Sequence, residues 1–515
     1  MNEEKGKLAR LFLGAGSAYA VTLLGWLLLY MYNGYVQIVD GKTALFGAVT
    51  VCAAVAVVYN LIRCPNRPRL RWYACELWLA GLCLLYVVNL LWSQDPAVSF
   101  WGLAGRRNGT CMLLLCAMCY LLVRIGVRQG DVPLLLQVFL GASCCAALLA
   151  WLNYFMMDPL SVYYSLQPGE DHMFLSTLGN INFFGGLMSM AAPVALYGCT
   201  RAHTQSAVYA WGAVSVLLCS ALVPANSDGP WLGFVVGVAV LLCLKRTDTR
   251  MVGRLLTISA VFFVCAALVG WVSKTAQVRG ELRTISAWLC QPVVALPGVF
   301  LCGVLAFLLS KRRPVVCARF FRWSALCVVL ALLALVVAVN AGLVDGGAWR
   351  ELLLFSPQWG SGRGYVWSVL TQSYVNELSV LEKIAGVGAE GVNALLNPLY
   401  TNQIVELNGR SFDSAHNVYL QHLICAGAVG LLCWCGFWLG RLRCAWRRCA
   451  IFAAPLAAYC VQAFFSIDTP AVLVPAIVFA ALTAVPAGEG KEKKTVLSGA
   501  VFLCFAGMVL ASLLL

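Results

Sequence analysis

The chain has 515 residues, of which 61% are hydrophobic and only 11% are charged, and its formal net charge is +14. This composition is too apolar for a soluble domain of any class and indicates a membrane protein. The positive charge does not call for nucleic acid, because basic connections facing anionic lipid account for it.

Apolar runs of about 20 residues, the length that crosses a bilayer, recur along the whole chain. Backbone groups have no water to bond in lipid, so these runs must be helices. The sequence therefore predicts an all-α, polytopic membrane protein with roughly 12–15 transmembrane helices. The expected spans are 11–32, 43–62, 72–92, 110–127, 132–156, 181–200, 207–223, 231–244, 255–272, 288–310, 325–343, 418–440, 449–467, 471–486 and 495–515.

Basic residues set the expected orientation. With the N-terminus on the cytoplasmic side, most of the 36 Lys and Arg residues fall in inner connections, as in "KRRPVVCARFFR" at 311–322. Three polar segments, 93–109, 157–183 and 344–416, then lie at the outer face of the cytoplasmic (inner or plasma) membrane. The last is one large loop, far longer than an ordinary connection, and such loops are usually functional or disordered.

The 24 cysteines lie mostly inside apolar spans, as in "ASCCAALL", where they serve as small core residues. No pair of CxxC motifs and no His/Cys cluster has the spacing of metal ligands. The sequence predicts no metal site and no cofactor.

The large loop contains an amphipathic pattern from Tyr365 onward. Such a helix lies on the membrane surface, caps a cavity, or only packs on its neighbours. The following "GVGAEG" at 386–391 matches GxGxxG, but no strand precedes it, so a turn is expected rather than a nucleotide site. The apolar residues of the pattern, spaced by three and four, are Trp367, Leu370, Tyr374, Leu378 and Leu381.

The loop ends in "SAHNVYLQHLICAG" at 414–427. Asp413 or Ser414 is the expected N-cap, which would place His416 and Asn417 in the first turn of the next helix. That positive end of the dipole attracts phosphate and favours a neutral imidazole able to accept a proton. The alternative for His416 is a satisfied histidine at the interface, with no further role.

Three outer-face arginines stand among glycines, against the general distribution of basic residues. Arg106 and Arg107 occur in "GLAGRRNG", and Arg363 occurs in "GSGRGYVW". A guanidinium binds phosphate oxygens in a fork and stays charged, which favours capture of an anion at the outer leaflet. Each one alone is also compatible with a headgroup contact or a helix anchor.

Together, these motifs resemble a known family. In order, the chain carries "FWGLAGRRNG", "LGNINFFGGLMSM" at 178–190, "NSDGPWLG" at 226–233, "GRGYVWSVL", "IAGVGAEG" and "SAHNVYLQHLICAGAVGLL". From about residue 93 to about residue 485, the sequence is similar to the superfamily of bacterial O-antigen ligases and O-antigen polymerases. The expected organisation is an N-terminal helical part at 1–92, a ligase-like core at 93–343, the large loop at 344–416 and C-terminal helices at 417–515.

The resemblance implies a metal-independent glycosyltransferase of cell-envelope polysaccharide or glycoconjugate assembly. Its partners would be an undecaprenyl-diphosphate-linked glycan donor, membrane lipids, and a hydroxyl acceptor on a lipid, glycan, cell-wall polymer or protein. Arg363 and His416 occupy the motifs of the family's essential arginine and histidine. Arg363 would stabilise the leaving diphosphate, and His416 would accept or orient the acceptor's proton. The expected substrate-binding residues are Arg106, Arg107, Asn182, Asp228 and Asn417.

One departure from the family concerns Asp228. Many members carry Ser-Arg-Gly where this chain has "SDG" at 227–229. Either Arg106 and Arg107 replace that arginine, or the donor or acceptor differs. Asn180 and Asn182 have two interpretations, hydrogen bonding to sugar or satisfying the backbone of a broken helix.

Other functional classes stay open. A transporter or lipid-linked glycan flippase is the alternative, although transporters place paired ionisable residues near mid-membrane. The spans hold few such residues, of which Glu76 is the clearest. No glycosidase-type pair of carboxylates is expected at the outer face, which suits a diphosphate leaving group. Ligase and polymerase share fold and donor, so the sequence does not separate them.

Overall fold

A computed structural model describes residues 15–63, 72–408, 412–485 and 493–512. These residues form helices almost throughout, with one short antiparallel strand pair, β1 (Phe174–Leu175) and β2 (Gly179–Asn180). Residues 11–14 of the first expected span and 513–515 of the last lie outside the described part.

Eight helices are long and apolar enough to cross a membrane, and seven shorter apolar helices accompany them in the described part. The prediction of an all-α polytopic membrane protein is confirmed. The long helices are α4 (Ile38–Arg63), α8 (Val132–Tyr154), α9 (Ile181–Arg201), α10 (Gln205–Ser220) continued by α11 (Leu222–Ala225), α13 (Thr249–Val272), α15 (Pro292–Ser310), α16 (Ala318–Asn340) and α21 (Val418–Arg448). The shorter ones are α2 (Ala15–Val21) continued by η1 (Thr22–Trp26) and α3 (Leu27–Leu29), α5 (Ala74–Asn89), α7 (Thr110–Gly126), α12 (Asp228–Cys243), α22 (Ala450–Gln462) continued by η7 (Ala463–Phe465), α23 (Pro470–Leu482) and α24 (Lys493–Ser512).

Short elements fill the connections. They are α6 (Pro96–Trp101), η2 (Gln129–Asp131), η3 (Tyr163–Ser165), η4 (Asp171–Met173), η5 (Ser176–Leu178), α14 (Thr284–Cys290), η6 (Gly347–Trp349), α17 (Arg350–Leu353), α18 (Trp359–Asn376), α19 (Val380–Ala385) and α20 (Gly391–Asn408).

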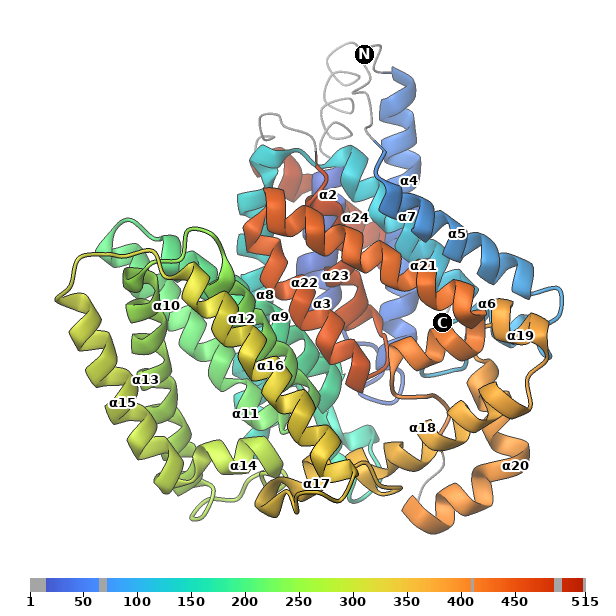
Figure 1. Cartoon of the computed structure of the whole chain (residues 1–515). Helices are drawn as coiled ribbons and strands as arrows, with labels where there is room; N and C mark the ends of the chain where they lie inside the picture. Colours follow the sequence, from blue (N-terminus) through green and yellow to red (C-terminus); the bar gives the residue numbers. More distant parts are fainter. Residues whose placement is uncertain (1–14, 64–71, 409–411, 486–492, 513–515) are drawn as a thin grey trace.

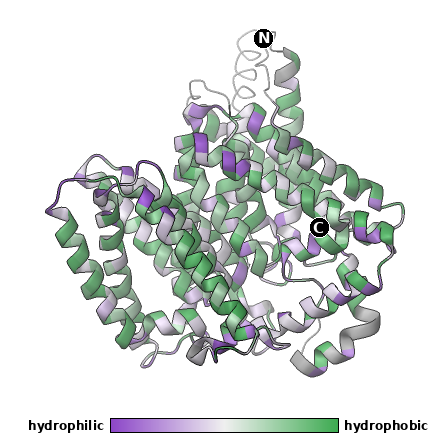
Figure 2. Ribbon diagram, viewed as in Figure 1, coloured by the Kyte–Doolittle hydropathy of each residue, from purple (hydrophilic) through white to green (hydrophobic). Residues whose placement is uncertain are grey.

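Helix α9 lies at the centre of the bundle, while α13 and α15 lie at its left side and α16 crosses in front of α12 (Figure 1). Glycines bring α9, α12 and α22 close together, since a Cβ at Gly233 would meet the Ala458 carbonyl oxygen at 2.7 Å. Hydrophobic residues cover most helical surfaces (Figure 2). On α15 and α16 many large apolar side chains are exposed, which fits contact with lipid.

The chain between α16 and α21 forms α17, α18 and α20 at one end of the bundle, at the bottom of Figure 1, which we call the loop end, and α19 at the right edge of the bundle beside α21. The predicted amphipathic helix is α18, which buries Val366, Val369 and Leu370. It packs on η7, with the Trp367 and Phe464 ring centroids 5.4 Å apart. The predicted apolar pattern extends beyond the end of α18, because its last residue, Leu381, belongs to α19 and is exposed.

The "GVGAEG" segment docks into a break in α21. Gly427 has φ +66°, outside the helical region, and the break leaves carbonyls of the preceding turn free. The Val387 N–H donates to the Ile424 carbonyl at 3.1 Å, and the Gly388 N–H donates to the Cys425 carbonyl at 3.1 Å. The segment is a loop, as expected, and it satisfies backbone groups of a broken helix.

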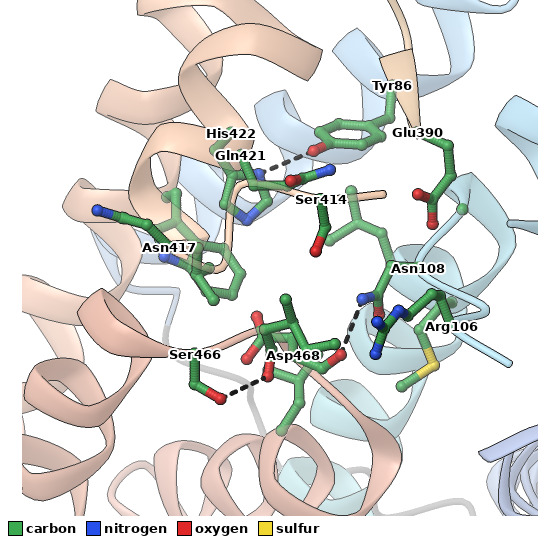
Figure 3. A pocket seen from close by; sticks show the side chains of 17 residues that line it. Tyr86, Arg106, Asn108, Glu390, Ser414, Asn417, Gln421, His422, Ser466 and Asp468 are labelled. Carbon is green, nitrogen blue, oxygen red and sulfur yellow. Dashed lines mark hydrogen bonds between the residues drawn. The ribbon is translucent and has the colours of Figure 1, made fainter. Parts of the chain in front are cut away.

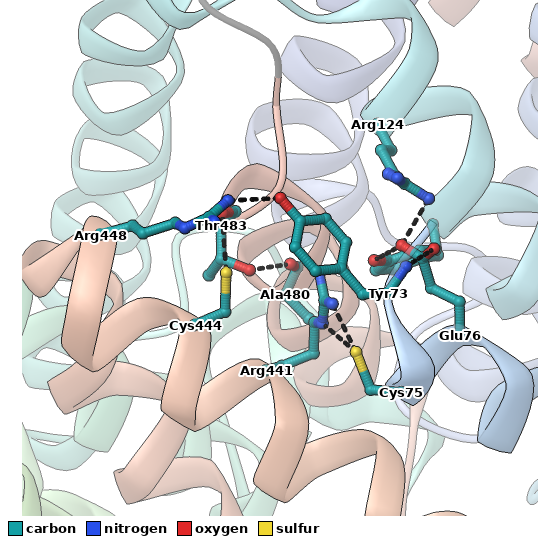
Figure 4. Close-up of polar contacts among 10 residues, drawn as sticks. Tyr73, Cys75, Glu76, Arg124, Arg441, Cys444, Arg448, Ala480 and Thr483 are labelled. Atoms are coloured by element: carbon teal, nitrogen blue, oxygen red, sulfur yellow. Dashed lines mark hydrogen bonds and ion pairs between the residues drawn. The ribbon is translucent and has the colours of Figure 1, made fainter. Parts of the chain in front are cut away.

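At the opposite end, buried charges tie α5, α7 and α21 together (Figure 4). Glu76 forms an ion pair with Arg124, and it accepts a hydrogen bond of 2.7 Å from the Tyr120 hydroxyl. Arg441 donates to the Cys75 sulfur at 3.1 Å. Glu76, which the sequence offered as an isolated ionisable residue, therefore belongs to a cluster with two fully buried arginines.

Replacing Glu76 by glutamine is expected to lower the free energy of unfolding by about 3–5 kcal/mol, because Arg124 would keep its buried charge without a carboxylate. Thermal unfolding of the detergent-solubilised protein measures this. Glu351→Gln, at an exposed site on α17, is the matched control and is expected to stay within about 0.5 kcal/mol of wild type. Equal melting temperatures for the two variants would refute a stabilising role for the pair.

Candidate functional site

A polar pocket of about 70 Å³ lies at the loop end, where α7, α21 and α23 begin (Figure 3). Residues just before each helix line it, including Asn108, Ser414, Asn417 and Asp468. The pocket therefore faces the positive ends of three helix dipoles. Two buried polar atoms of its lining, Ser414 Oγ and Glu390 Oε1, have no hydrogen-bond partner among the described residues. Unpaired polar atoms beside a pocket are positioned to bind a ligand.

The start of α21 differs from the prediction. Asn417 is the N-cap, and its side-chain oxygen accepts from the backbone N–H groups of Tyr419 and Leu420 at 3.0 and 3.1 Å. The expectation that Asp413 or Ser414 caps the helix is wrong, and so is the placement of His416 and Asn417 in its first turn. His416 precedes the cap in a left-handed conformation with φ +48°.

Arg106 is held by Asp413 in a two-pronged ion pair. Its Nε donates to Oδ2 at 2.8 Å and its Nη2 donates to Oδ1 at 3.1 Å. Burial alone would raise the pKa of Asp413, but the hydrogen bonds and charge of Arg106, with a contribution from His416, hold that pKa below its ordinary value. The His416 ring also contacts Phe412, with centroids 5.4 Å apart. Arg106, Asp413 and His416 thus form one charged group beside the pocket.

Arg107 has a different neighbour. It pairs with Asp40 at the start of α4, and the same carboxylate accepts from the Gly105 N–H at 3.0 Å. Arg107 therefore anchors the 102–109 loop to α4, whereas the adjacent Arg106 side chain lines the pocket.

Asn182 contacts Ser227, the residue before Asp228, where α9 and α12 begin. The Ser227 hydroxyl donates to Asn182 Oδ1 at 2.5 Å, and Asn180 Oδ1 accepts from the Asn182 N–H at 2.9 Å. The Asn180 side chain thus satisfies a backbone group at the start of α9, as the second interpretation has it, whereas the Asn182 side chain bonds to the side chains of Asn180 and Ser227. Sugar binding by either residue stays a prediction. Asp228 interacts electrostatically with Arg363 on α18, so these two predicted site residues are neighbours.

Only some of the predicted site residues therefore line the pocket. Within the described part of the chain, the pocket lining includes Arg106 and Asn417 but not Arg107, Asn182, Asp228, Arg363 or His416. Helix α18 nevertheless covers segments beside the pocket, since the Trp367 indole donates to the Ala415 carbonyl at 2.8 Å.

Two carboxylates in the pocket were missed. Glu390 and Asp468 lie on different sides of the same cavity (Figure 3). The two residues are 78 positions apart in sequence, and only the fold brings them to one pocket. Their sequence signal is weak, because Glu390 lies within the large loop and Asp468 is a single acidic residue between two apolar segments. The expectation that the outer face lacks a glycosidase-type pair stays a prediction. Among the described residues, no three His, Cys, Asp or Glu side chains are placed to hold a metal ion.

Both carboxyls are desolvated. Burial raises the pKa of Glu390 to about 7, and the charge of Asp413 adds to this, while backbone hydrogen bonds from Asn108 and Leu103 and the charge of Arg106 oppose it. Burial likewise raises the pKa of Asp468 to about 7, against a hydrogen bond of 2.8 Å from the Tyr459 hydroxyl. Each carboxyl is therefore able to gain or lose a proton near neutral pH.

His422 is a buried residue of α21, and its Nδ1 shares a hydrogen bond of 2.8 Å with the Tyr86 hydroxyl. The ring also stacks near Trp434, with centroids 4.2 Å apart, and lines the pocket.

An apolar groove of about 660 Å³ adjoins the site between α18 and α21. Trp367, Tyr419, Leu423 and Phe464 are among its lining residues, and it shares Asn417 with the polar pocket. The α21 N-cap thus stands between the pocket, which contains the charged side chains, and the groove, which is lined by uncharged residues.

Fold and site together define a polytopic helical membrane protein with a polar, carboxylate-containing pocket at the end that carries its longest connection. No protein-family model matches the chain, and no curated protein matches it.

Proposed function

We propose that this protein is a glycosyltransferase of the bacterial cytoplasmic membrane, similar to O-antigen ligases and polymerases. It transfers a glycan from an undecaprenyl-diphosphate carrier to an acceptor hydroxyl at the outer face. The observation that carries the proposal is the pocket itself, where Arg106, two titratable carboxyls and three helix N-termini meet. This arrangement offers positive potential for a diphosphate and acceptors for a hydroxyl proton.

The apolar groove supports the lipid-carrier part of the proposal. An isoprenoid chain fits a groove lined by Trp367, Leu423 and Phe464, and Asn417 then lies between the chain and the polar pocket. Arg106, with Arg363 on the covering helix α18, would hold the diphosphate.

For His416 we propose a role that differs from the two that the resemblance implies. Because its ring lies beside Phe412 and Asp413, we assign it to orienting the Arg106–Asp413 pair. Proton transfer then falls to a group that lines the pocket.

Transport is less well supported. The buried pair of Glu76 and Arg124 joins the first turn of α5 to the last turn of α7. It therefore lies near one end of the bundle, whereas transporters place such pairs near the midplane.

Loss of Arg106 tests the proposed function. In cells of the native host with matched amounts of protein in the membrane, Arg106→Ala, Arg363→Lys and His416→Ala are each expected to reduce the polymer or conjugate by at least about 10-fold. The lipid-linked precursor, extracted from the same cells, should accumulate. Arg350→Lys, an exposed residue paired with Asp345 on the same loop, is the control and should behave as wild type. Wild-type product and precursor levels in all three variants would reject the transferase.

The accumulated precursor also separates the two forms of the enzyme. A precursor with a full-length glycan indicates a ligase, whereas a precursor with a single repeat indicates a polymerase.

A further inference from the structure

Glu390 occupies an unusual position in the pocket. It follows Gly388 in the loop that docks on α21, it has φ +60°, and its residue surface is only 5% exposed. Backbone N–H groups of Leu103 and Asn108 hydrogen-bond to its carboxyl group. Its Oε1 atom is buried and has no hydrogen-bond partner among the described residues. The carboxyl is therefore held by backbone groups and keeps one unsatisfied oxygen, in a residue that lines the pocket.

A structural role alone does not explain this arrangement. A buried carboxyl oxygen without a hydrogen bond is destabilising, and Arg106, whose charge acts on Glu390, directs its Nε and Nη2 at the Asp413 carboxylate rather than at Glu390. A ligand that donates a hydrogen bond would satisfy Oε1. The pocket volume of about 70 Å³ admits a polar group or a few water molecules, and so it suits the hydroxyl end of an acceptor better than a whole sugar chain.

We infer that Glu390 is the proton acceptor for the attacking hydroxyl, with Asp468 across the pocket as a second hydrogen-bond acceptor that positions it. This inference rests on the proposed function and names the acceptor side of the same site. The ligand class is an alcohol, such as a sugar or a hydroxyl-bearing lipid, polymer or protein side chain.

The proposed reaction is a displacement at the anomeric carbon of the donor glycan. The acceptor oxygen forms a bond to the anomeric carbon while the bond from that carbon to the diphosphate oxygen breaks. The bonding electron pair leaves with the undecaprenyl diphosphate, and the hydroxyl proton passes to Glu390 Oε1. A base whose pKa lies near 7 is well matched to this transfer at neutral pH.

The charged and titratable groups around Glu390 fix how its titration is interpreted. They are Tyr86 on α5, Arg106 in the 102–109 loop, Asp413 at the end of the large loop, His422 and Cys425 on α21, and Asp468 just before α23. Asp413 is ionised and tied to Arg106, so Glu390 and Asp468 are the carboxyls that change charge near neutral pH.

The test measures transfer rate against pH with full-length protein in membranes. The donor is the undecaprenyl-diphosphate-linked glycan extracted from a host strain that lacks the gene, and the acceptor is the native one in the same membranes. Wild-type transfer is expected to rise with pH and to level off above about 7. Glu390→Gln should lower the rate about 100-fold or more and flatten the rise, whereas Glu390→Asp should keep a pH-dependent part of the activity. Glu351→Gln, exposed on α17, should match wild type.

The possible results test the inference about Glu390 and the proposed function separately. A Glu390→Gln variant that keeps the wild-type rate overturns the inference. A variant that loses rate but keeps the wild-type pH profile makes Glu390 structural and overturns it too. If wild-type membranes transfer no glycan from this donor, the proposed function falls and the inference falls with it, whereas the first two results leave the proposed function standing.

Discussion

Replacing Gly427 by alanine is expected to destabilise the protein by about 2–6 kcal/mol and to detach the 386–390 loop from α21. A Cβ at this position would meet the carbonyl carbon of Ile384 at 2.3 Å and the amide nitrogen of Ala385 at 2.5 Å. These atoms are backbone and cannot rotate away. The glycine also has φ +66°, a conformation that costs an alanine about 1–3 kcal/mol, and displacing the packed loop adds about 1–3 kcal/mol.

The effect should reach the pocket through Glu390, because this residue belongs to the displaced loop. Hydrogen exchange at the Val387 and Gly388 amides, which bond to carbonyls of α21, measures the detachment, and thermal unfolding measures the loss of stability. Gly303→Ala on α15 is the matched control, since its Cβ would meet nothing within 4 Å. We expect that control to be neutral or stabilising by up to about 1 kcal/mol. If the Val387 and Gly388 amides exchange as slowly in Gly427→Ala as in the control, the break in α21 does not depend on this glycine.

Much of the fold was predictable from the sequence, because lipid leaves an apolar run of 20 residues no alternative to a helix. Even the segments at 181–200 and 495–515 appear as α9 and α24 within the described residues. The start of α21 was not predictable. Asp413, Ser414 and Asn417 are all good N-caps, and the choice depends on Arg106, which binds the Asp413 carboxylate from 307 residues away.

The candidate site was predictable only in part, for the same reason. Arg106 and Asn417 were found because glycine-flanked arginine and a helix start are local signals. Glu390 was passed over because its segment was interpreted only as a turn, and Asp468 because one acidic residue between two spans carries no pattern. Their meaning depends on burial and on each other, and neither property is visible in a single sequence.

A second large effect is expected for Glu390→Gln: above neutral pH the substitution should raise the stability of the protein, although it lowers the rate of transfer. The pKa of Glu390 is about 7 in the folded protein, against an ordinary value of 4.5. Between these two pH values the folded state binds a proton that the unfolded state has released, so the free energy of unfolding falls as pH rises. The contribution is fully present below about pH 4.5 and is lost above about 7. The total loss is about 3 kcal/mol.

Glutamine mimics the protonated carboxyl and stays neutral. The variant should therefore match wild type near pH 4.5 and exceed it by about 3 kcal/mol at pH 8, measured by unfolding of the solubilised protein at several pH values. Asp413 contributes with the opposite sign, because its pKa is lowered, and its stabilisation is lost only as the pH falls through the acid range. Because Asp413 is present in both proteins, its contribution cancels when the free energy of unfolding of wild type is subtracted from that of Glu390→Gln.

The two measurements on Glu390 together distinguish function from architecture. A carboxyl kept for the fold should cost stability when it is replaced, whereas a carboxyl kept for proton transfer should cost activity while its replacement stabilises the protein. If Glu390→Gln melts lower than wild type at pH 8, the carboxylate is contributing a stabilising interaction in its ionised form, and its unpaired oxygen is then no sign of a ligand. If the variant melts higher and transfers nothing, the destabilising buried charge is maintained for the reaction in the pocket.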